Sequence, residues 1–319
     1  MNFTRTRLHL ALVSSLLGLA ACQQQSEPAG DAAASTSAAP VAVADTAPAV
    51  TEDRINPENW PRQEPVMVRD ADMEAKIQDL LDRMSIEDKV GQIIQPDIAS
   101  VTPEKVKQYR LGSVLNGGGS APDGDLRNTP DSWLALADEF WEASTDTSDG
   151  GLGIPAIWGT DAVHGHANIV GATVFPHNIG LGAANDPELM YRIGQVTALE
   201  MLATGFDWTF APTIAVVRND RWGRTYEGYS EDPRIVAAYA PKIVEGLQGK
   251  YGSDDFLSES RMMATAKHFV GDGGTIEGRD QGDNVSTEAE FRDIHAAGYP
   301  PAVAAGVQTV MASYLSLIH

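Results

Sequence analysis

Five residues with ionisable or hydrogen-bonding side chains lie within a few residues after predicted strands. They are Asp161, His164, Lys267, His268 and Tyr314. In parallel α/β barrels the carboxyl ends of the strands form the active-site face, so residues far apart in the sequence meet in one pocket. A pocket with several fixed donors and acceptors suits a ligand that carries many hydroxyl groups. The alternative for Asp161 and the Lys267-His268 pair is a structural ion pair at a strand end.

Two further patterns in this part of the chain could indicate a different chemistry. His164 and His166 alternate along the chain, as metal ligands on one face of a strand do, but no third or fourth ligand is placed near them. The glycine-rich segment 270–275 lacks the G-x-x-x-x-G-K-[ST] sequence of a phosphate-binding loop, and its glycines more simply allow a tight turn. The sequence therefore predicts neither a metal ion nor a cofactor.

Helical and strand-like segments alternate along the chain from residue 59 onward. Strand-like segments lie at 93–95, 111–115, 154–158, 206–210, 262–266 and 309–312. Predicted helices begin at the capping residues Ser85, Thr102 and Asp186, among others. Such alternation predicts βαβ units and a parallel sheet. The expected fold class is α/β, as a TIM-type (β/α)8 barrel that is incomplete, with about six β/α units present.

The charge of the chain argues against one class of partner. Asp and Glu number 44 against 23 Lys and Arg, which gives a formal net charge of −21. A surface of this sign repels phosphate backbones, so nucleic acid is not an expected partner, whereas a neutral sugar is indifferent to it. Hydrophobic residues make up 43% of the chain, which is enough for a sizeable core.

The N-terminal residues precede the predicted fold. Residues 1–21 combine a basic start with an apolar run, the pattern of a secretory signal peptide. They end in a sequence that resembles the bacterial lipobox, which predicts that Cys22, the only cysteine, anchors the chain to a membrane through lipid. Gln23, where an Asp would indicate inner-membrane retention, favours the outer membrane. Residues 22–58, rich in Ala, Ser, Thr and Pro, are predicted to be a flexible tether.

Five sequence blocks occur in the order found in glycoside hydrolase family 3. They lie at 159–165, 172–182, 210–232, 267–275 and 310–314. One block alone indicates little, but the five in order make the chain similar to this family over about residues 59–314, which is nearly all of the predicted fold. That stretch is therefore predicted to be the N-terminal barrel domain of the family.

The resemblance implies an activity and the residues that bind its substrate. The implied reaction is hydrolysis of terminal non-reducing β-D-glucosyl residues from β-glucosides or β-glucan oligosaccharides, with retention. No His occurs between the Lys-His block and His295, which favours this branch over the β-N-acetylglucosaminidases. The implied sugar-binding residues are Asp161, Arg224, Lys267, His268 and Tyr314. A carboxylate that accepts and cations that donate form charge-assisted bonds, which fix the position of a sugar ring.

Two neighbouring residues are expected to have supporting roles. Glu227 is expected to orient Arg224. Arg221 is expected to pair with Glu231 or Asp232 and so to hold a long loop in place.

The catalytic carboxyl groups of a retaining glycosidase are not found in this sequence. Such an enzyme needs a nucleophile and an acid/base. In the family the nucleophile is an Asp in a Ser-Asp-Trp sequence, which does not occur here, and the acid/base of the glucosidases comes from a second domain. The resemblance therefore places both the nucleophile Asp and the acid/base Glu beyond His319.

Two expectations follow for the chain as it stands. By itself it is expected to be inactive, with residues 315–319 a non-native tail. The alternative is a non-catalytic sugar-binding lipoprotein, against which the unpaired strand edges of an open barrel argue.

Overall fold

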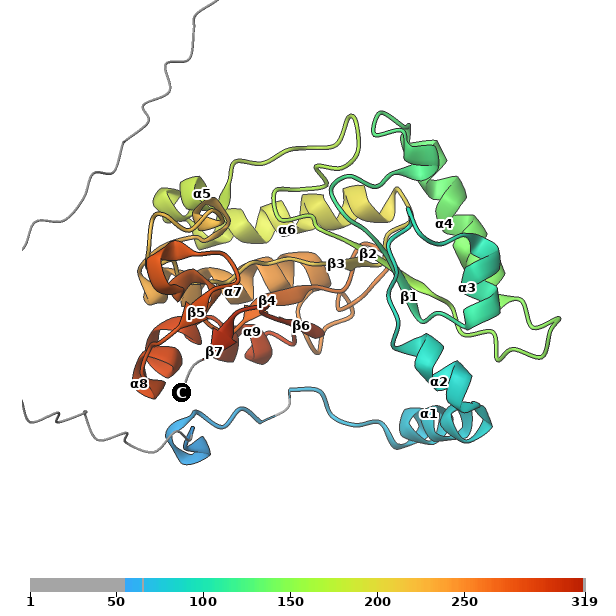
Figure 1. Ribbon diagram of the computed structural model, residues 1–319, viewed down its shortest axis with the longest axis horizontal. Coiled ribbons are helices and arrows are strands. Elements are labelled where there is room, and N and C mark those ends of the chain that lie inside the picture. Colours follow the sequence, from blue (N-terminus) through green and yellow to red (C-terminus); the bar gives the residue numbers. More distant parts are fainter. Residues whose placement is uncertain (1–54, 65, 318–319) are drawn as a thin grey trace, which may run out of the picture. The chain divides into compact units, whose positions relative to one another are not determined.

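The computed structural model describes residues 55–64 and 66–317 of the chain (Figure 1). Its helices are α1 (Ala71–Arg83), α2 (Ile86–Gln92), α3 (Pro103–Tyr109), α4 (Pro130–Thr145), α5 (Asn178–Ala184), α6 (Pro187–Leu202), α7 (Pro233–Gln248), α8 (Glu288–Glu290) and α9 (Tyr299–Ala304). Its strands are β1 (Ser113–Asn116), β2 (Ile157–Thr160), β3 (Trp208–Thr209), β4 (Thr265–Phe269), β5 (Asp283–Asn284), β6 (Thr309–Ala312) and β7 (Ser316–Leu317).

Some of the sequence predictions fall outside these ranges. The predicted signal peptide and Cys22 lie outside the described residues, as does His319, beyond which the two catalytic carboxyl groups are expected. Within the described part of the chain, no helix is both long enough and apolar enough to span a membrane.

All strand pairs are parallel: β1, β2 and β3 follow one another in chain order, β4 pairs with β6, and β5 pairs with β7. β1, β2 and β3 are neighbours, with Val114 beside Trp158 and Gly159 beside Trp208. A parallel bridge from Trp208 to Met263 continues this order toward β4, which pairs with β6. Parallel neighbours require crossover connections, and helices supply them here. The predicted α/β class is thereby confirmed.

The strand predicted at residues 93–95 is wrong. The N–H groups of Ile93 and Ile94 donate back to carbonyl groups in the last turn of α2, both at 3.2 Å. These bonds hold the segment in a turn, so its backbone does not extend into a strand. Beyond the turn, Asp97 alone forms a parallel bridge with Leu115 of β1.

Several helices begin where capping residues predict them. Ser85 and Asp88 form a capping box at the start of α2. Asp186 accepts the N–H of Leu189 at 3.1 Å at the start of α6. These side chains satisfy N–H groups that have no partner inside the helix, which fixes where each helix starts.

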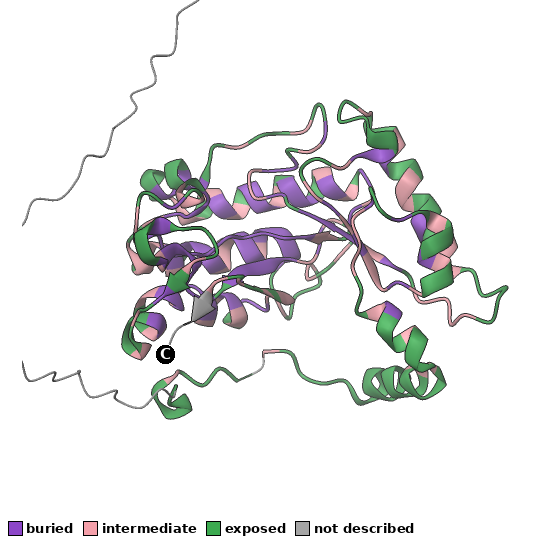
Figure 2. Cartoon of the chain, in the orientation of Figure 1, coloured by how far each residue is buried: buried purple, intermediate pink, exposed green. Residues whose placement is uncertain are grey.

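A cluster of aromatic side chains packs between β2 and α4. The rings of Trp158 and Phe206 lie 4.6 Å apart, and Trp133 and Phe140 contact Trp158 at 5.9 and 5.4 Å. All four side chains are buried. Figure 2 shows the same burial along one side of α6 and α7, whereas α1 is exposed. The aromatic cluster anchors β2, and Asp161 directly follows this strand.

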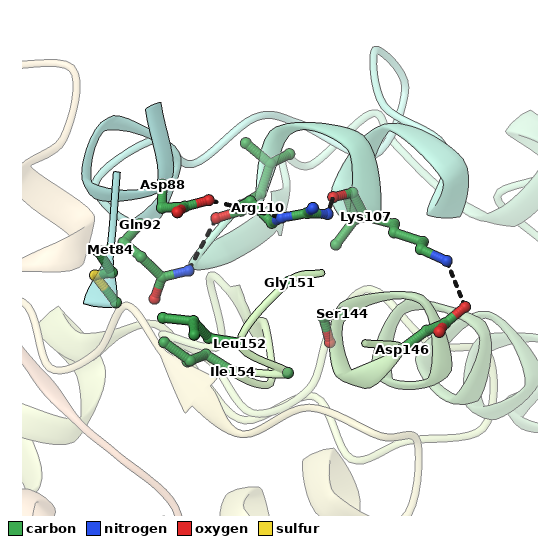
Figure 3. A pocket seen from close by; sticks show the side chains of 13 residues that line it. Met84, Asp88, Gln92, Lys107, Arg110, Ser144, Asp146, Gly151, Leu152 and Ile154 are labelled. Carbon is green, nitrogen blue, oxygen red and sulfur yellow. Dashed lines mark hydrogen bonds and ion pairs between the residues drawn. The ribbon is translucent and has the colours of Figure 1, made fainter. Parts of the chain in front are cut away.

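A separate, small cavity lies where α2, α3 and the end of α4 meet (Figure 3). Its volume is about 20 Å³. Arg110 contacts Asp149 at 2.8 Å and Asp88 at 3.6 Å, and Lys107 contacts Asp146 at 2.5 Å. These ion pairs tie the loop between α4 and β2 to α2 and α3. None of the predicted sugar-binding residues lines this cavity.

Candidate functional site

A pocket of about 240 Å³ lies at the carboxyl ends of β2 and β4. It is lined by Asp161, Val163, His164, Gly165, Ala167, Arg224, Tyr226, Glu227 and Lys267. Asp161 directly follows β2, Lys267 lies within β4, and Arg224 precedes a short 3-10 turn that ends at Glu227. The structure therefore brings five of the residues singled out from the sequence into one pocket: Asp161, His164, Arg224, Glu227 and Lys267.

The Lys267 ammonium group is buried and pairs with Asp161. Nζ donates to Oδ1 of Asp161, and the side chain of Lys267 is 3% exposed whereas that of Asp161 is 54% exposed. The register of β4 against β6 shifts between Lys267 and Phe269, a bulge of the kind that redirects side chains beside active sites. Asp161 and Lys267 thus form the ion pair that was the structural alternative to a role in sugar binding. It also leaves a carboxylate facing the pocket as an acceptor.

Two hydrogen bonds from Arg224 to Glu227 fix the guanidinium group at the pocket. Nε donates to Oε1 at 2.8 Å, and Nη2 donates to Oε2 at 2.7 Å. Burial acts to raise the pKa of Glu227, but the hydrogen bond and charge of Arg224, together with the charge of the nearby Lys267, outweigh it and lower that pKa. Glu227 is therefore a carboxylate at neutral pH, and it orients Arg224 in the way expected from the sequence.

His268 connects Arg224 to a buried aspartate that the sequence analysis did not single out. His268 Nε2 lies 3.2 Å from Arg224 Nη2, and His268 Nδ1 lies 2.8 Å from Asp272 Oδ2. Both His268 and Asp272 are buried. Asp272 lies in the glycine-rich segment that was interpreted only as a turn. Its position four residues after His268 is the signal that could have identified it.

The ion pair predicted between Arg221 and Glu231 or Asp232 is wrong. Asp232 instead pairs with Arg234 at 2.6 Å and accepts the N–H of Arg234 at 2.9 Å as the N-cap of α7. Capping turns the Asp232 carboxylate toward the start of its own helix. Arg218 donates to the backbone carbonyl of Glu231 at 3.0 Å.

The structure places Tyr314, His164 and His166 in three different surroundings. Tyr314 follows β6, is 85% exposed and is not among the residues that line the pocket. His166 is buried with Nε2 2.8 Å from Thr204 Oγ1, and burial lowers its pKa to about 4. His164 lines the pocket, with Nε2 2.9 Å from His177 Nδ1. Among residues 55–64 and 66–317, no group of three or more His, Cys, Asp or Glu side chains is arranged to hold a metal ion.

The polar groups of the pocket match what an uncharged polyhydroxyl ligand requires. Asp161 accepts hydrogen bonds, whereas Arg224 and Lys267 can only donate them. The aromatic ring of Tyr226 stands at the edge of the pocket, 41% exposed and 4.6 Å from the ring of His177. A sugar ring presents hydroxyl groups around its edge and an apolar face, so fixed charges and an aromatic ring can both contact it.

Known proteins match the chain over most of this region. The profile of the Glycosyl hydrolase family 3 N terminal domain covers residues 85–318. A lysosomal beta glucosidase from Dictyostelium discoideum is 32% identical over 253 residues, which are 74% of this chain and 30% of that protein. A periplasmic beta-glucosidase from Salmonella typhimurium is 28% identical over 250 residues, which are 76% of this chain and 29% of that protein.

Solved structures match the fold as well. An exo-1,3/1,4-beta-glucanase from a Pseudoalteromonas species is 54% identical with a TM-score of 0.79, over 83% of this chain and 32% of that one. A mutant beta-glucosidase from Listeria innocua in complex with laminaribiose is 25% identical with a TM-score of 0.63, over 76% of this chain and 33% of that one. The chain thus spans about a third of the length of the relatives that it matches. The matched domain has a TIM-barrel-like α/β fold, in agreement with the parallel strand order. The chain belongs to glycoside hydrolase family 3, through the N-terminal domain of that family.

Proposed function

We propose that this chain supplies the sugar-binding barrel of a glycoside hydrolase that removes terminal β-D-glucosyl residues from the non-reducing ends of β-glucosides or β-glucans. The observation that carries the proposal is the pairing of the half-exposed Asp161 carboxylate with the buried Lys267 ammonium group in one pocket. Arg224, held by Glu227, adds a second oriented cation to the same pocket.

These groups favour a ligand with a defined set of hydroxyl groups. A net hydrogen bond to a charged group contributes about 1.5–3 kcal/mol. A site whose polar groups are built to pair with hydroxyls discriminates strongly against sugars in which one is missing, because its own groups are then left unpaired. The matched relatives named as a beta-glucosidase with laminaribiose and as an exo-1,3/1,4-beta-glucanase support a β-glucan substrate.

The reaction that we propose is retaining and needs no cofactor. Retention requires a nucleophile and an acid/base about 5–5.5 Å apart. The Ser-Asp-Trp sequence expected to carry the nucleophile does not occur in these 319 residues. We therefore expect a polypeptide of this sequence to bind the sugar without hydrolysing it.

We further propose that the protein is exported and anchored through lipid at Cys22 to the outer membrane. The basic and apolar start of the chain and the lipobox-like sequence before Cys22 support this location. The name of the periplasmic relative from Salmonella typhimurium agrees with a site outside the cytoplasm. Cys22→Ala should abolish incorporation of labelled fatty acid, and equal labelling of the variant would contradict the anchor.

The proposed activity is tested by adding laminaribiose, cellobiose and an aryl β-glucoside to the purified chain. Binding is followed by saturation-transfer NMR, and turnover is followed by release of the aryl group. We expect saturable binding of the disaccharides and no turnover. Turnover would contradict the predicted inactivity, and the absence of binding by all three sugars would overturn the proposed function.

A further inference from the structure

Four polar side chains form a continuous chain from the pocket to the protein interior. Glu227 binds Arg224, Arg224 contacts His268, and His268 contacts Asp272. An ionised carboxylate only accepts hydrogen bonds and a guanidinium group only donates them. His268 Nε2 must therefore accept from Arg224 Nη2. The ring hydrogen of His268 is then on Nδ1, where it is donated to Asp272 Oδ2 at 2.8 Å.

The turn that carries Asp272 is packed so that its carboxylate is held in place. Gly271 adopts a φ of 100°, in the region that favours glycine, and its carbonyl group accepts Asn284 Nδ2 at 2.6 Å. A Cβ atom on Gly273 would lie 2.3 Å from the carbonyl oxygen of Val216, so the turn packs directly on that neighbouring backbone. Asp272 itself is 7% exposed. A carboxylate in so close-packed a turn has little freedom to leave His268.

We propose that Asp272 is a positioning residue for the sugar pocket. By holding the ring hydrogen of His268 on Nδ1, it keeps Nε2 free to accept from Arg224. The opposite tautomer would place an N–H group toward Arg224, and two donors would face each other across 3.2 Å. The guanidinium group would then lose one of its two anchors. The consequence for sugar binding rests on the proposed function, whereas the consequence for the tautomer does not.

Asp272→Asn tests this role because it changes the carboxylate into an amide of nearly the same shape. The amide can donate to Nδ1, and in an aspartate–histidine pair this substitution leads to the wrong tautomer. Asp283→Asn is the matched control, since it makes the same change at an exposed carboxylate, in β5. The tautomer of His268 is read by ¹⁵N NMR of the full chain, with His268→Gln used to assign its signals.

We expect Nδ1–H in the wild type and in Asp283→Asn, and Nε2–H in Asp272→Asn. Glucose should bind Asp272→Asn about tenfold more weakly, the loss expected for one hydrogen bond to a charged group. A ring hydrogen on Nε2 in the wild type would overturn the inference, and this measurement needs no variant. An unchanged tautomer in Asp272→Asn would overturn it as well. If the His268 tautomer changes in Asp272→Asn but this variant binds glucose as tightly as the wild type, the role of Asp272 at the sugar pocket is overturned. If the wild type binds no glucose, the proposed function fails. The NMR result still decides whether Asp272 determines the tautomer of His268.

Discussion

The pair formed by Arg224 and Glu227 can be weakened without removing a side chain, by Glu227→Gln. The amide keeps one acceptor oxygen, but it loses the charge and turns an N–H group toward the guanidinium group. One of the two bonds, at 2.8 and 2.7 Å, is then lost. A hydrogen bond to a charged group contributes about 1.5–3 kcal/mol. Because the Arg224 side chain is 32% exposed, hydrogen bonds to water can replace part of the lost stabilisation. We therefore expect a loss of about 2 kcal/mol in the free energy of unfolding at neutral pH.

The effect should depend on pH in a defined direction. Burial raises the pKa of Glu227, but Arg224 outweighs it, so the pKa in the folded state lies below its ordinary value. In the unfolded state a Glu has a pKa of about 4.3 and takes up a proton first as the pH falls. The stabilisation is thus complete above that pH and is lost as the pH falls through the folded pKa. The difference between wild type and Glu227→Gln should therefore shrink in acid.

Urea denaturation at pH 7 and pH 3 measures this difference. With a slope of about 3 kcal/mol per molar urea, a loss of about 2 kcal/mol lowers the midpoint by about 0.7 M. Glu231→Gln is the control, because it makes the same change at an exposed residue. Equal midpoints for wild type and Glu227→Gln at pH 7, or a difference that is undiminished at pH 3, would refute the reasoning.

Two buried positions give further predictions. Burial lowers the pKa of His166 to about 4, so the unfolded state takes up a proton first, and stability falls by up to about 1.4 kcal/mol per pH unit between about pH 6.5 and 4. In His166→Gln this pH dependence of the unfolding free energy should be absent when urea denaturation is measured from about pH 6.5 to 4. A pH dependence equal to that of the wild type would contradict the prediction. A Cβ atom at Gly182 would lie 1.7 Å from the carbonyl oxygen of Tyr229, so Gly182→Ala should lower stability by about 2 kcal/mol despite its better helix propensity. Gly118→Ala, with nothing within 4 Å, is the control, and equal melting temperatures for the two variants would argue against this packing.

The fold was predictable where local signals and the hydrophobic pattern agreed. Ser85 and Asp186 mark helix starts through hydrogen bonds to nearby N–H groups, so the sequence alone identifies them. The segment 93–95 misled because two isoleucines at a helix end have the same composition as a short strand. Only the hydrogen bonds back to α2 distinguish the two, and these depend on how the chain turns.

The residues of the site could be predicted from their positions after strands, whereas the ion pairs they form could be predicted less well. Asp161 and Lys267 were placed together because each was predicted to follow a parallel strand. Asp161 does follow β2, whereas β4 extends through Lys267 to Phe269. Asp232 was named, with Glu231, as a possible partner of Arg221, although Pro233 after it already indicated a helix start. Capping of that helix determines where the Asp232 carboxylate lies. Asp272 was overlooked because a carboxylate between glycines looks like a turn residue. Its role depends on a contact with His268 that only the folded turn creates.

The central claim, that this pocket binds a glucosyl unit through Asp161, is tested most directly by calorimetric titration of glucose. Asp161→Asn removes the carboxylate that faces the pocket, and Asp220→Asn, at an exposed residue that does not line it, is the control. We predict saturable binding by the wild type and the control, and binding about 10–100-fold weaker by Asp161→Asn. The absence of saturable binding by the wild type, or equal affinity in Asp161→Asn, would contradict the claim.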